Sequence, residues 1–322
     1  MNSQFAEDIR LGLSSTPKYL PSKYFYNEKG DKLFQEIMHM PEYYLTRSEF
    51  EIFTQQKEKI LSLFSDGTSN GDKFHLIEFG AGDGLKTKVL LKYFLEKTSK
   101  FIYSPVDISG YVLSELSESL KVELPNLQVK AIEDDYFKAL EKVKSSTEFQ
   151  NTTRRIVMFL GSNIGNFLQK SAVTFLSAVS DNLSSGDLLL IGFDLKKNPK
   201  VVLDAYNDAA GITKAFNLNL LERINKELGG DFQINQFEHY PTYSPITGAT
   251  KSYLISSKPQ KVMIESIGES FEFQRWEPID MELSFKYSLE EIDELANSSG
   301  FEVVENLFDC KHFFTDSIWR KN

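Results

Sequence analysis

Residues 74–91 constrain the fold of this chain more than any other stretch. An apolar run that contains Leu76, Ile77 and Phe79 ends in a glycine-rich turn at residues 80–84, and a helical pattern follows at once. Glycines at such a turn let the backbone approach a ligand closely, because no Cβ stands in the way. A strand, a glycine-rich turn and a helix in this order predict the nucleotide-binding edge of a parallel α/β sheet. A tight turn without a ligand would give the same short pattern.

The spacing of the glycines argues against a dinucleotide cofactor. The fingerprint G-x-G-x-x-G needs its third glycine at position 85, where this chain has Leu85. The pattern is instead E-x-G-x-G-x-G, with Glu78 at the strand end, and it resembles motif I of S-adenosylmethionine (SAM) methyltransferases. SAM carries a sulfonium cation and no pyrophosphate, so an acidic residue is acceptable beside it. A nicotinamide-dependent oxidoreductase is therefore disfavoured.

Two further acidic segments follow predicted strands. Asp107 lies at the end of a strand over residues 101–108, where an acid about 20 residues past the glycines accepts hydrogen bonds from ribose hydroxyls. A third strand over residues 127–132 leads to Asp135 and Tyr136, an acid–aromatic pair that could hold an adenine by its exocyclic amine and by stacking. The alternative for Asp135 and Tyr136 is an acidic loop exposed to solvent.

The predicted sheet continues with apolar strands over residues 155–160 and 187–195, the first of which leads to Asn166. Continuous apolar strands that alternate with helices predict a parallel sheet covered on both faces. Ligands bind beyond the carboxyl ends of the strands in such sheets. Four polar residues occupy these ends: Glu78, Asp107, Asp135 and Asn166.

The rest of the chain departs from this alternation. Residues 1–60 predict short helices interrupted by aromatic residues, with a turn at 28–31 and a helix that starts near Ser48. The aromatic residues fit either a lid over the ligand or a plug against the sheet. Residues 200–228 predict a helix, and short alternating segments between 232 and 287 predict an antiparallel sheet. Together they form an insertion at 197–286.

The C-terminal segment returns to the first pattern. Ser288 and Glu291 form a capping-box signature for a helix that ends before Gly300. Residues 301–308 and 314–319 predict two closing strands. A surface loop is expected at residues 65–72.

The composition excludes several classes of function. The net charge of −10 over 322 residues argues against a nucleic-acid surface. No apolar run approaches the ~20 residues that span a bilayer, and the N-terminus lacks the pattern of a signal peptide. One cysteine, Cys310, cannot form an internal disulfide, so we expect a cytoplasmic protein. Four scattered histidines give no zinc-ligand spacing.

Seven motifs resemble, in order, those of the histidine-specific methyltransferases: YFYNEKGDKLF, MPEYYLTRSE, EFGAGDGLKT, PVDIS, FLGSNIGN, AYNDAAGITKAFN and ELSFKYS. These enzymes trimethylate the α-amine of L-histidine to hercynine, the first step toward ergothioneine. The resemblance covers nearly the whole chain. It implies an α/β fold, a Rossmann-like class I SAM methyltransferase with a seven-stranded, mostly parallel sheet at residues 61–196 and 287–322. It also implies an α+β substrate-binding cap at residues 1–60 and 197–286.

The resemblance also implies site residues. Those matching SAM-contacting positions are Gly80, Gly82, Lys86, Asp107, Asp135 and Tyr136, to which the motif adds Glu78. Those matching substrate-binding positions are Tyr43, Asn166 and Tyr206 for the carboxylate, Tyr26 and Phe34 near the α-ammonium, and Glu282 and Ser284 for the imidazole. SAM is then the methyl-donating co-substrate, no metal is needed, and L-histidine and its methylated intermediates bind to a monomer.

Three of the substrate residues also have a plainer interpretation. Glu282 alone fits an edge-strand charge, Tyr206 fits a core residue, and Asn166 fits a helix cap. Three positions depart from the family pattern: Ser252 stands where a methionine can line the imidazole pocket, Asn163 where threonine is common, and Tyr136 where Phe is found. The first two bear on substrate preference. Methylation of another amine, and SAM binding without turnover, therefore stay open as alternatives.

Overall fold

The computed structural model describes residues 3–66, 74–97, 101–145 and 154–322. The chain divides into two compact units. The larger unit contains Leu45–Lys196 and Lys286–Asn322, and the smaller unit contains Met1–Tyr44 and Lys197–Phe285. The smaller unit thus interrupts the larger one in sequence, as the predicted insertion requires. Most of the loop expected at residues 65–72 lies outside the described residues.

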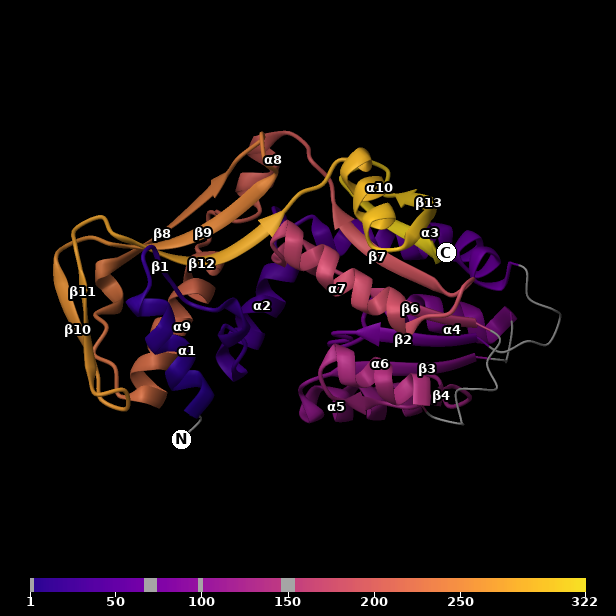
Figure 1. Ribbon diagram of the computed structural model, residues 1–322, viewed down its shortest axis with the longest axis horizontal. Helices are drawn as coiled ribbons and strands as arrows, with labels where there is room; N and C mark the ends of the chain where they lie inside the picture. The colour runs from indigo at the N-terminus through magenta and orange to yellow at the C-terminus, as the bar shows by residue number, and fades with distance from the viewer. Residues whose placement is uncertain (1–2, 67–73, 98–100, 146–153) are drawn as a thin grey trace. The chain divides into compact units, whose positions relative to one another are not determined.

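A mostly parallel sheet forms the centre of the larger unit (Figure 1). Its strands are β2 (Phe74–Phe79), β3 (Phe101–Asp107), β4 (Gln128–Val129), β5 (Ile132–Glu133), β6 (Arg154–Phe159), β7 (Leu188–Asp194), β13 (Phe301–Phe308) and β14 (Phe314–Lys321). Their order is β13-β14-β7-β6-β2-β3-β4, and β5 follows β4 along the same edge of β3. Counting β4 and β5 as one interrupted strand gives the seven positions that the sequence predicts.

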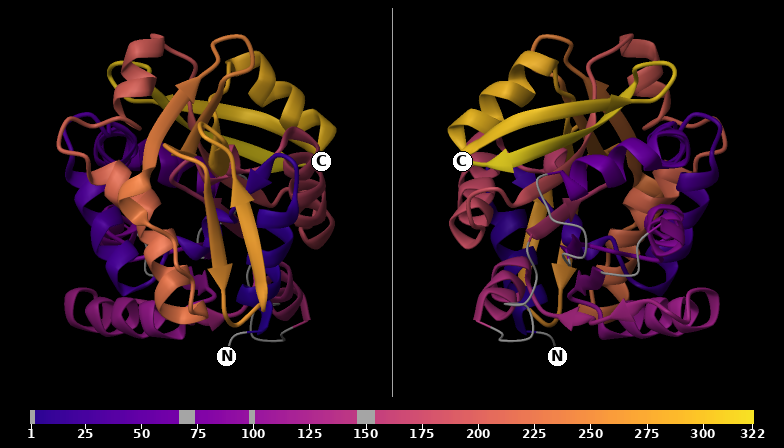
Figure 2. Two further views of the ribbon diagram at one scale, coloured as in Figure 1. Left: turned by 90° about the vertical axis from the view of Figure 1, so that its left-hand side faces the viewer. Right: turned by 90° about the vertical axis from the view of Figure 1, so that its right-hand side faces the viewer.

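The closing strands form an antiparallel hairpin inside this order. β14 is antiparallel to both β7 and β13, whereas β2, β3, β6 and β7 are parallel to one another. Figure 2 shows the two yellow strands of the hairpin running side by side near the C-terminus. Every residue of β2 and β7 is buried, as expected for strands covered on both faces.

Helices cover the sheet of the larger unit in two groups. In the first group, α3 packs on α4, and an ion pair between Lys88 and Glu123 joins α4 to α5. In the second group, α7 packs on both α6 and α10. The bounds are α3 (Leu45–Ser65), α4 (Thr87–Lys97), α5 (Gly110–Glu123), α6 (Tyr136–Ser145), α7 (Gln169–Asn182) and α10 (Leu289–Ser298), with the short 3-10 helix η2 (Asn163–Asn166). The capping box that begins α10 is present as predicted, with Ser288 and Glu291 as its two partners.

The smaller unit is built on a second sheet of order β1-β12-β9-β8. Its strands are β1 (Lys18–Tyr19), β8 (Phe237–Tyr243), β9 (Ala249–Ser256) and β12 (Pro278–Phe285), and a separate hairpin contains β10 (Gln260–Ile264) and β11 (Glu269–Phe273). Its helices are α1 (Ser3–Ser14), η1 (Ser22–Tyr24), α2 (Glu28–His39), α8 (Pro199–Asp204), α9 (Ile212–Leu228) and η3 (Ile234–Gln236).

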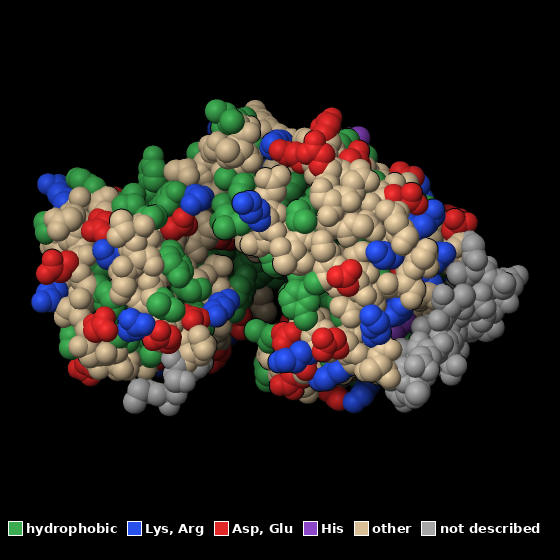
Figure 3. Space-filling model, viewed as in Figure 1, with side chains coloured by type: hydrophobic (Ala, Val, Ile, Leu, Met, Phe, Trp, Pro, Cys, Tyr) green, Lys and Arg blue, Asp and Glu red, His purple; other side chains and the backbone are tan. Residues whose placement is uncertain are grey.

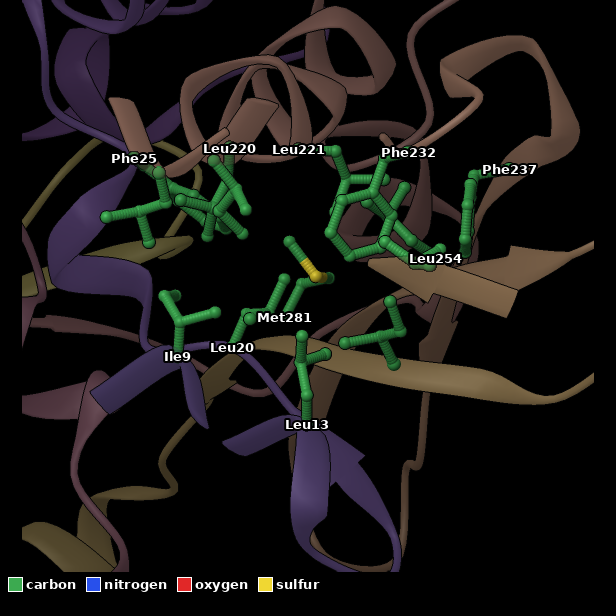
Figure 4. Packing of buried hydrophobic residues seen from close by; sticks show 14 of the residues in the cluster. Ile9, Leu13, Leu20, Phe25, Leu220, Leu221, Phe232, Phe237, Leu254 and Met281 are labelled. Carbon is green, nitrogen blue, oxygen red and sulfur yellow. The ribbon is translucent and has the colours of Figure 1, made fainter. Parts of the chain in front are cut away.

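The smaller unit has a hydrophobic core of its own. Side chains from α1, α9 and the sheet point toward one another, among them Ile9, Leu221, Leu254 and Met281 (Figure 4). A separate core lets this unit keep its shape without residues of the parallel sheet. Lys, Arg, Asp and Glu alternate over the visible surface without a large area of one charge (Figure 3).

Several predicted boundaries differ from the structure. α3 begins at Leu45, and its packing on α4 and β14 places residues 45–60 with the larger unit instead of the cap. Residues 28–31 form the first turn of α2, because the Asn27 side chain accepts a hydrogen bond from Gly30 N–H and caps the helix. The helix predicted at 200–228 is interrupted between α8 and α9, where Asp208 caps the first turn of α9. The third strand is split into β4 and β5, and β11 was not predicted.

Two of the three points at which the chain passes between the units, after Lys196 and before Lys286, are anchored in the larger unit. Lys196 N–H donates to Tyr287 O at 2.8 Å, and Tyr287 N–H donates to Asp194 O at 2.9 Å. The ammonium of Lys286 lies 2.9 Å from the Asp194 carboxylate, and both side chains are fully buried. The two crossing segments are therefore fastened side by side.

Removing one charge of this buried pair should destabilise the larger unit strongly. Lys286→Met leaves Asp194 buried and uncompensated, a change that costs ~3–5 kcal/mol. The double variant Lys286→Met/Asp194→Asn removes both charges and should recover much of that loss. Urea unfolding followed by circular dichroism measures both. A double variant no more stable than the single one would contradict the pairing.

Candidate active site

The glycine-rich turn after β2 has the backbone that the sequence predicts. Gly80, Gly82 and Gly84 have φ angles of +66°, +54° and +66°, in the left-handed region that favours glycine. A Cβ at Gly84 would lie 2.6 Å from Leu116 Cδ1 on α5, so this glycine permits the packing of the turn on that helix. A Cβ at Gly82 would meet no atom within 4 Å. The turn thus has one glycine needed for packing and one facing open space.

Glu78, at the end of β2, is buried with both carboxylate oxygens occupied. Thr87 Oγ1 donates to Oε1 at 2.7 Å, and Tyr103 OH donates to Oε2 at 2.6 Å. Burial raises the pKa of Glu78 to about 7, although the two hydrogen bonds oppose the shift. Glu78 therefore ties α4 and β3 to the turn, and both oxygens already have donors within the larger unit.

The raised pKa of Glu78 makes the stability of the fold depend on pH. The folded protein holds this proton more tightly than the unfolded chain, whose value is near 4.5, so stability is lost as the pH rises through about 7. Glu78→Gln mimics the protonated acid and should exceed the unchanged protein in stability by up to about 3 kcal/mol at high pH. The gain should vanish near pH 4.5. Thermal unfolding across this range measures it, and an equal effect at both ends would contradict the assignment.

Asp107, Asp135 and Tyr136 lie at the carboxyl ends of β3 and β5, as predicted. Asp107 Oδ1 accepts a hydrogen bond from Ser109 N–H at 2.9 Å, and its side chain is half-buried. Asp135 Oδ1 accepts from the N–H groups of Phe137 and Lys138 and caps α6, while Oδ2 pairs with the Lys138 ammonium at 2.9 Å. These hydrogen bonds, that of Lys138 N–H first, lower the pKa of Asp135, which is a carboxylate at neutral pH.

Tyr136 packs against other aromatic rings of the larger unit. Its ring stacks on Phe79 with the centroids 4.8 Å apart and meets Phe159 and Phe175 edge-on. The hydroxyl lies 3.2 Å from the position that a Cβ on Gly80 would occupy. Burial raises the pKa of Tyr136 to about 12, so the hydroxyl stays protonated and can donate. The structure therefore brings Tyr136 against the glycine-rich turn.

Lys86 has a partner that the sequence analysis missed. Its ammonium forms an ion pair with Glu49 of α3, a fully buried side chain. Glu49 Oε1 also accepts a hydrogen bond from Gly161 N–H at 2.7 Å, at the end of β6. Glu49 stands in the motif MPEYYLTRSE, but nothing in its sequence spacing indicates contact with two loops far away in the chain.

Asn166 ends the 3-10 helix η2 and is exposed. It does not cap α7, whose N-cap residue is Leu168, so the alternative of a helix cap is wrong. Ser162 starts this loop with a φ of +57°, and its hydroxyl accepts a hydrogen bond from Asp194 N–H. The predicted contact of Asn166 with a substrate carboxylate stays a prediction.

The smaller unit brings three of the predicted aromatic residues together. The ring centroids of Tyr26 and Phe34 lie 5.6 Å apart, and those of Phe34 and Tyr43 lie 6.5 Å apart. Phe216 of α9 joins them, 5.7 Å from Tyr26 and 5.9 Å from Phe34. Phe216 was missed, although it lies in the motif AYNDAAGITKAFN. We call these four residues the aromatic cluster.

A shift in strand register places Glu282. Ile279 pairs with Leu254 and Asp280 with Tyr253, but Glu282 pairs with Ser252 because Met281 is an extra residue in β12. Cross-strand partners share a face of a sheet, and a bulge changes which face the following residues occupy. Without it, strict alternation would place Glu282 on the face of Asp280.

Glu282 consequently lies on the inner face of this sheet, on which β9 buries its side chains. Its carboxylate is 3.4 Å from Ser252 Oγ. Ser284 lies on the same face opposite Thr250, a buried residue whose hydroxyl has no hydrogen-bond partner among the described residues. β12 also lies between β1 and β9 in the sheet order. Glu282, Ser284, Ser252 and Thr250 therefore form a polar group on the face that also carries Leu254 and Ile279.

Tyr206 follows α8 and is buried in the smaller unit. This burial also fits the plainer interpretation of a core residue, so its contact with a substrate stays a prediction. Among the described residues no cluster of His, Cys, Asp or Glu side chains could hold a metal ion. None of the described helices is both long and apolar enough to cross a membrane.

Comparison with known proteins adds to these features. Residues 5–321 match the sequence profile of a family described as histidine-specific methyltransferase, SAM-dependent. The chain belongs to this family. The methyltransferase is 33% identical over 285 residues to the histidine N-alpha-methyltransferase of Mycolicibacterium smegmatis, a match that covers 88% of this chain and 85% of the relative.

Other relatives have different names and lengths. Ergothioneine biosynthesis protein 1 of Neurospora crassa is 32% identical over 304 residues, which cover 89% of the methyltransferase but 32% of that protein. The L-tryptophan methyltransferase trpM of Psilocybe serbica is 28% identical over 314 residues, which cover 91% of the methyltransferase and 86% of the relative. Relatives of this fold thus include proteins named for different amino acids.

Proposed function

We propose that the methyltransferase transfers three methyl groups from SAM to the α-amine of L-histidine and so forms hercynine, the first step toward ergothioneine. The names of its relatives from Mycolicibacterium smegmatis and Neurospora crassa support this proposal. So does the order of the motifs along the chain. We further propose a cytoplasmic monomer, in keeping with the single, exposed Cys310.

The observation that carries the proposal is the inward-facing Glu282. A carboxylate accepts a hydrogen bond from an imidazole N–H, and Ser284 can donate to or accept from the other ring nitrogen. The Thr250 hydroxyl, unpartnered among the described residues, adds a further donor or acceptor on the same face. An apolar side chain could form no hydrogen bond with Glu282 or Ser284, a difference that favours histidine over apolar amino acids.

The aromatic cluster suits the product of each transfer. Once methylated three times, the amine is a permanent cation and can donate no hydrogen bond. A Tyr or Phe ring attracts such a cation by ~0.5–2 kcal/mol through its π face. Tyr26 is exposed and Phe34 half-buried, so both rings retain accessible surface. We assign the methylated ammonium to this cluster.

Methyl transfer to an amine requires little acid–base catalysis by the protein. The ammonium first loses a proton, and the lone pair of the neutral amine then attacks the methyl carbon of SAM. The carbon–sulfur bond breaks, and S-adenosylhomocysteine leaves. Peptide α-amino groups have pKa values of ~7.7–8.0, so a usable neutral fraction exists near neutral pH. The main task of the protein is to position the amine. We assign SAM to the glycine-rich turn with Asp107, Asp135 and Tyr136.

Methylation of another amino acid is the second candidate function. Ser252, where family members can have a methionine, lies 3.4 Å from Glu282, so a smaller and more polar side chain stands beside the proposed imidazole. A relative that is 28% identical to the methyltransferase is named for tryptophan, which supports testing other amino acids as substrates.

Mass spectrometry of the products distinguishes the candidates. The protein is incubated with SAM and a panel that includes L-histidine, L-tryptophan and L-phenylalanine. We expect mono-, di- and trimethylated histidine to form in succession and the other amino acids to react more slowly. Preferred methylation of another member of the panel would replace histidine as the substrate. SAM binding without any product would favour a module without turnover.

Glu282→Ala should weaken histidine binding without affecting SAM. Loss of a hydrogen bond to a charged group costs ~1.5–3 kcal/mol, so KM for histidine should rise by ~10- to 100-fold. Asp280→Ala, which removes a carboxylate from the opposite face of the same strand, is the matched control and should leave this KM unchanged. Steady-state kinetics and calorimetry with S-adenosylhomocysteine measure the two sites. An unchanged histidine KM in Glu282→Ala would remove the substrate assignment.

A further inference from the structure

A buried acid joins two loops at the ligand-binding edge of the larger unit. Glu49, on the first turns of α3, is fully buried, and its two oxygens have different partners. Oε1 accepts from Gly161 N–H at 2.7 Å, and Oε2 pairs with the Lys86 ammonium. Lys86 ends the glycine-rich turn, and Gly161 begins the loop that contains Asn166. One carboxylate therefore fastens two loops that follow different strands.

The sheet is shaped to receive this carboxylate. Gly192 of β7 lies under Glu49, and a Cβ at this position would come within 2.5 Å of Glu49 Oε1. The φ angle of Gly192 is not in the left-handed region, so the backbone itself does not require glycine. Space for Glu49 is therefore a reason for a glycine in the middle of a buried strand.

A second acid stands beside the first. Asp316 of β14 is the cross-strand partner of Gly192 and is fully buried. Neither of its carboxylate oxygens has a hydrogen-bond donor among the described residues. Burial raises the pKa of Asp316 well above its usual range, and the charge of Glu49 adds to this, while the charge of Lys86 opposes it. A proton on Asp316 would itself supply the missing donor, directed at Glu49.

We propose that Glu49 is a positioning residue for the SAM site, which holds Lys86 and the Gly161 loop in their binding geometry, and that Asp316 supports it as a neutral, protonated acid. The inference rests on the proposed placement of SAM at the glycine-rich turn. No family motif carried over to this chain assigns a role to either acid.

The charges of Lys86, Glu49 and Asp316 explain why the proposal needs both acids. With Asp316 protonated, the ammonium of Lys86 and the carboxylate of Glu49 balance, and the hydroxyl of Asp316 satisfies a further lone pair of Glu49. With Asp316 ionised, two carboxylates face one ammonium in a buried site, with the Glu78 carboxyl also near Lys86. Repulsion between the two carboxylates would then loosen both loops.

The first test replaces the charge and keeps the shape. Glu49→Gln keeps an amide oxygen for Gly161 N–H but leaves the Lys86 ammonium without its counter-charge. We expect Kd for S-adenosylhomocysteine and KM for SAM to rise ~10-fold or more, with a smaller loss of kcat at saturating SAM. Glu58→Gln is the matched control, since it makes the same change at an exposed position of α3, and should stay within about twofold of the unchanged protein.

The second test moves Glu49 without changing any charged residue. Gly192→Ala places a methyl group 2.5 Å from Glu49 Oε1 and 2.9 Å from Phe314 Cζ, and by displacing the carboxylate it should raise Kd for S-adenosylhomocysteine, as Glu49→Gln does. If Glu49→Gln gives no folded protein by circular dichroism, this variant decides the question. Folded Glu49→Gln or Gly192→Ala protein that binds S-adenosylhomocysteine as Glu58→Gln does would overturn the proposal.

The third test concerns the proton on Asp316. Binding of S-adenosylhomocysteine to the unchanged protein should weaken as the pH is raised across the range in which the protein stays folded, since a rise in pH favours ionisation of Asp316 beside Glu49. Asp316→Asn keeps a donor at every pH and should lack this weakening. Equal pH profiles for the two proteins would refute a neutral Asp316. Failure of the unchanged protein to bind S-adenosylhomocysteine would count against the proposed function instead.

Discussion

Charged side chains at the carboxyl ends of β2 and β7 are buried, and each has to be neutralised or paired inside the protein. Glu78 is neutralised in part, through two hydroxyl donors and a raised pKa. Asp194 is paired with Lys286, at the place where the chain returns from the smaller unit. The partners of Glu78 follow it closely in the sequence, whereas Lys286 is far from Asp194, so the pair at Asp194 forms only after the chain has returned from the smaller unit.

The same requirement explains why α3 belongs to the larger unit. Its residue Glu49 is the counter-charge for Lys86 and a hydrogen-bond acceptor for Gly161. The partly buried ammonium of Lys86 would be destabilised without Glu49, because burial disfavours the charged form. The helix therefore completes the edge of the sheet that the sequence analysis ascribed only to the strands and their loops.

The sequence predicted the parts of the fold that depend on local patterns. The glycine-rich turn, the strands around it and the capping box of α10 follow from apolar runs, glycine spacing and a two-residue signature. The boundary at Leu45 could not be predicted in this way, because it depends on the contact of α3 with α4 and β14. The interruption between α8 and α9 was missed because it depends on Asp208 capping a helix within a segment of helical composition.

In the candidate site, too, local sequence patterns predicted some residues, whereas residues that depend on distant contacts were missed. Asp107, Asp135 and Tyr136 could be placed at strand ends, since consecutive parallel strands present their carboxyl ends at one edge. Phe216 and Glu49 could not be identified, because their partners lie far away in the sequence. The face occupied by Glu282 was also beyond prediction. In a regular strand, alternate residues share a face, so the sequence places Glu282 on the same face as Asp280. The extra residue at Met281 is seen only in the structure, where Glu282 pairs with Ser252.

The bulge in β12 suggests how one fold can serve several amines. Methyl transfer to a neutral amine needs position more than acid–base catalysis, so the larger unit can remain the same while the substrate changes. Under the proposed function, discrimination then depends on a few side chains of the smaller unit that share the face of Glu282. Ser252 and Ser284 lie on that face, beside Leu254 and Ile279 of the core. The register shift at Met281 thus places Glu282 and Ser284, the residues proposed to bind the imidazole, on the same face as Ser252.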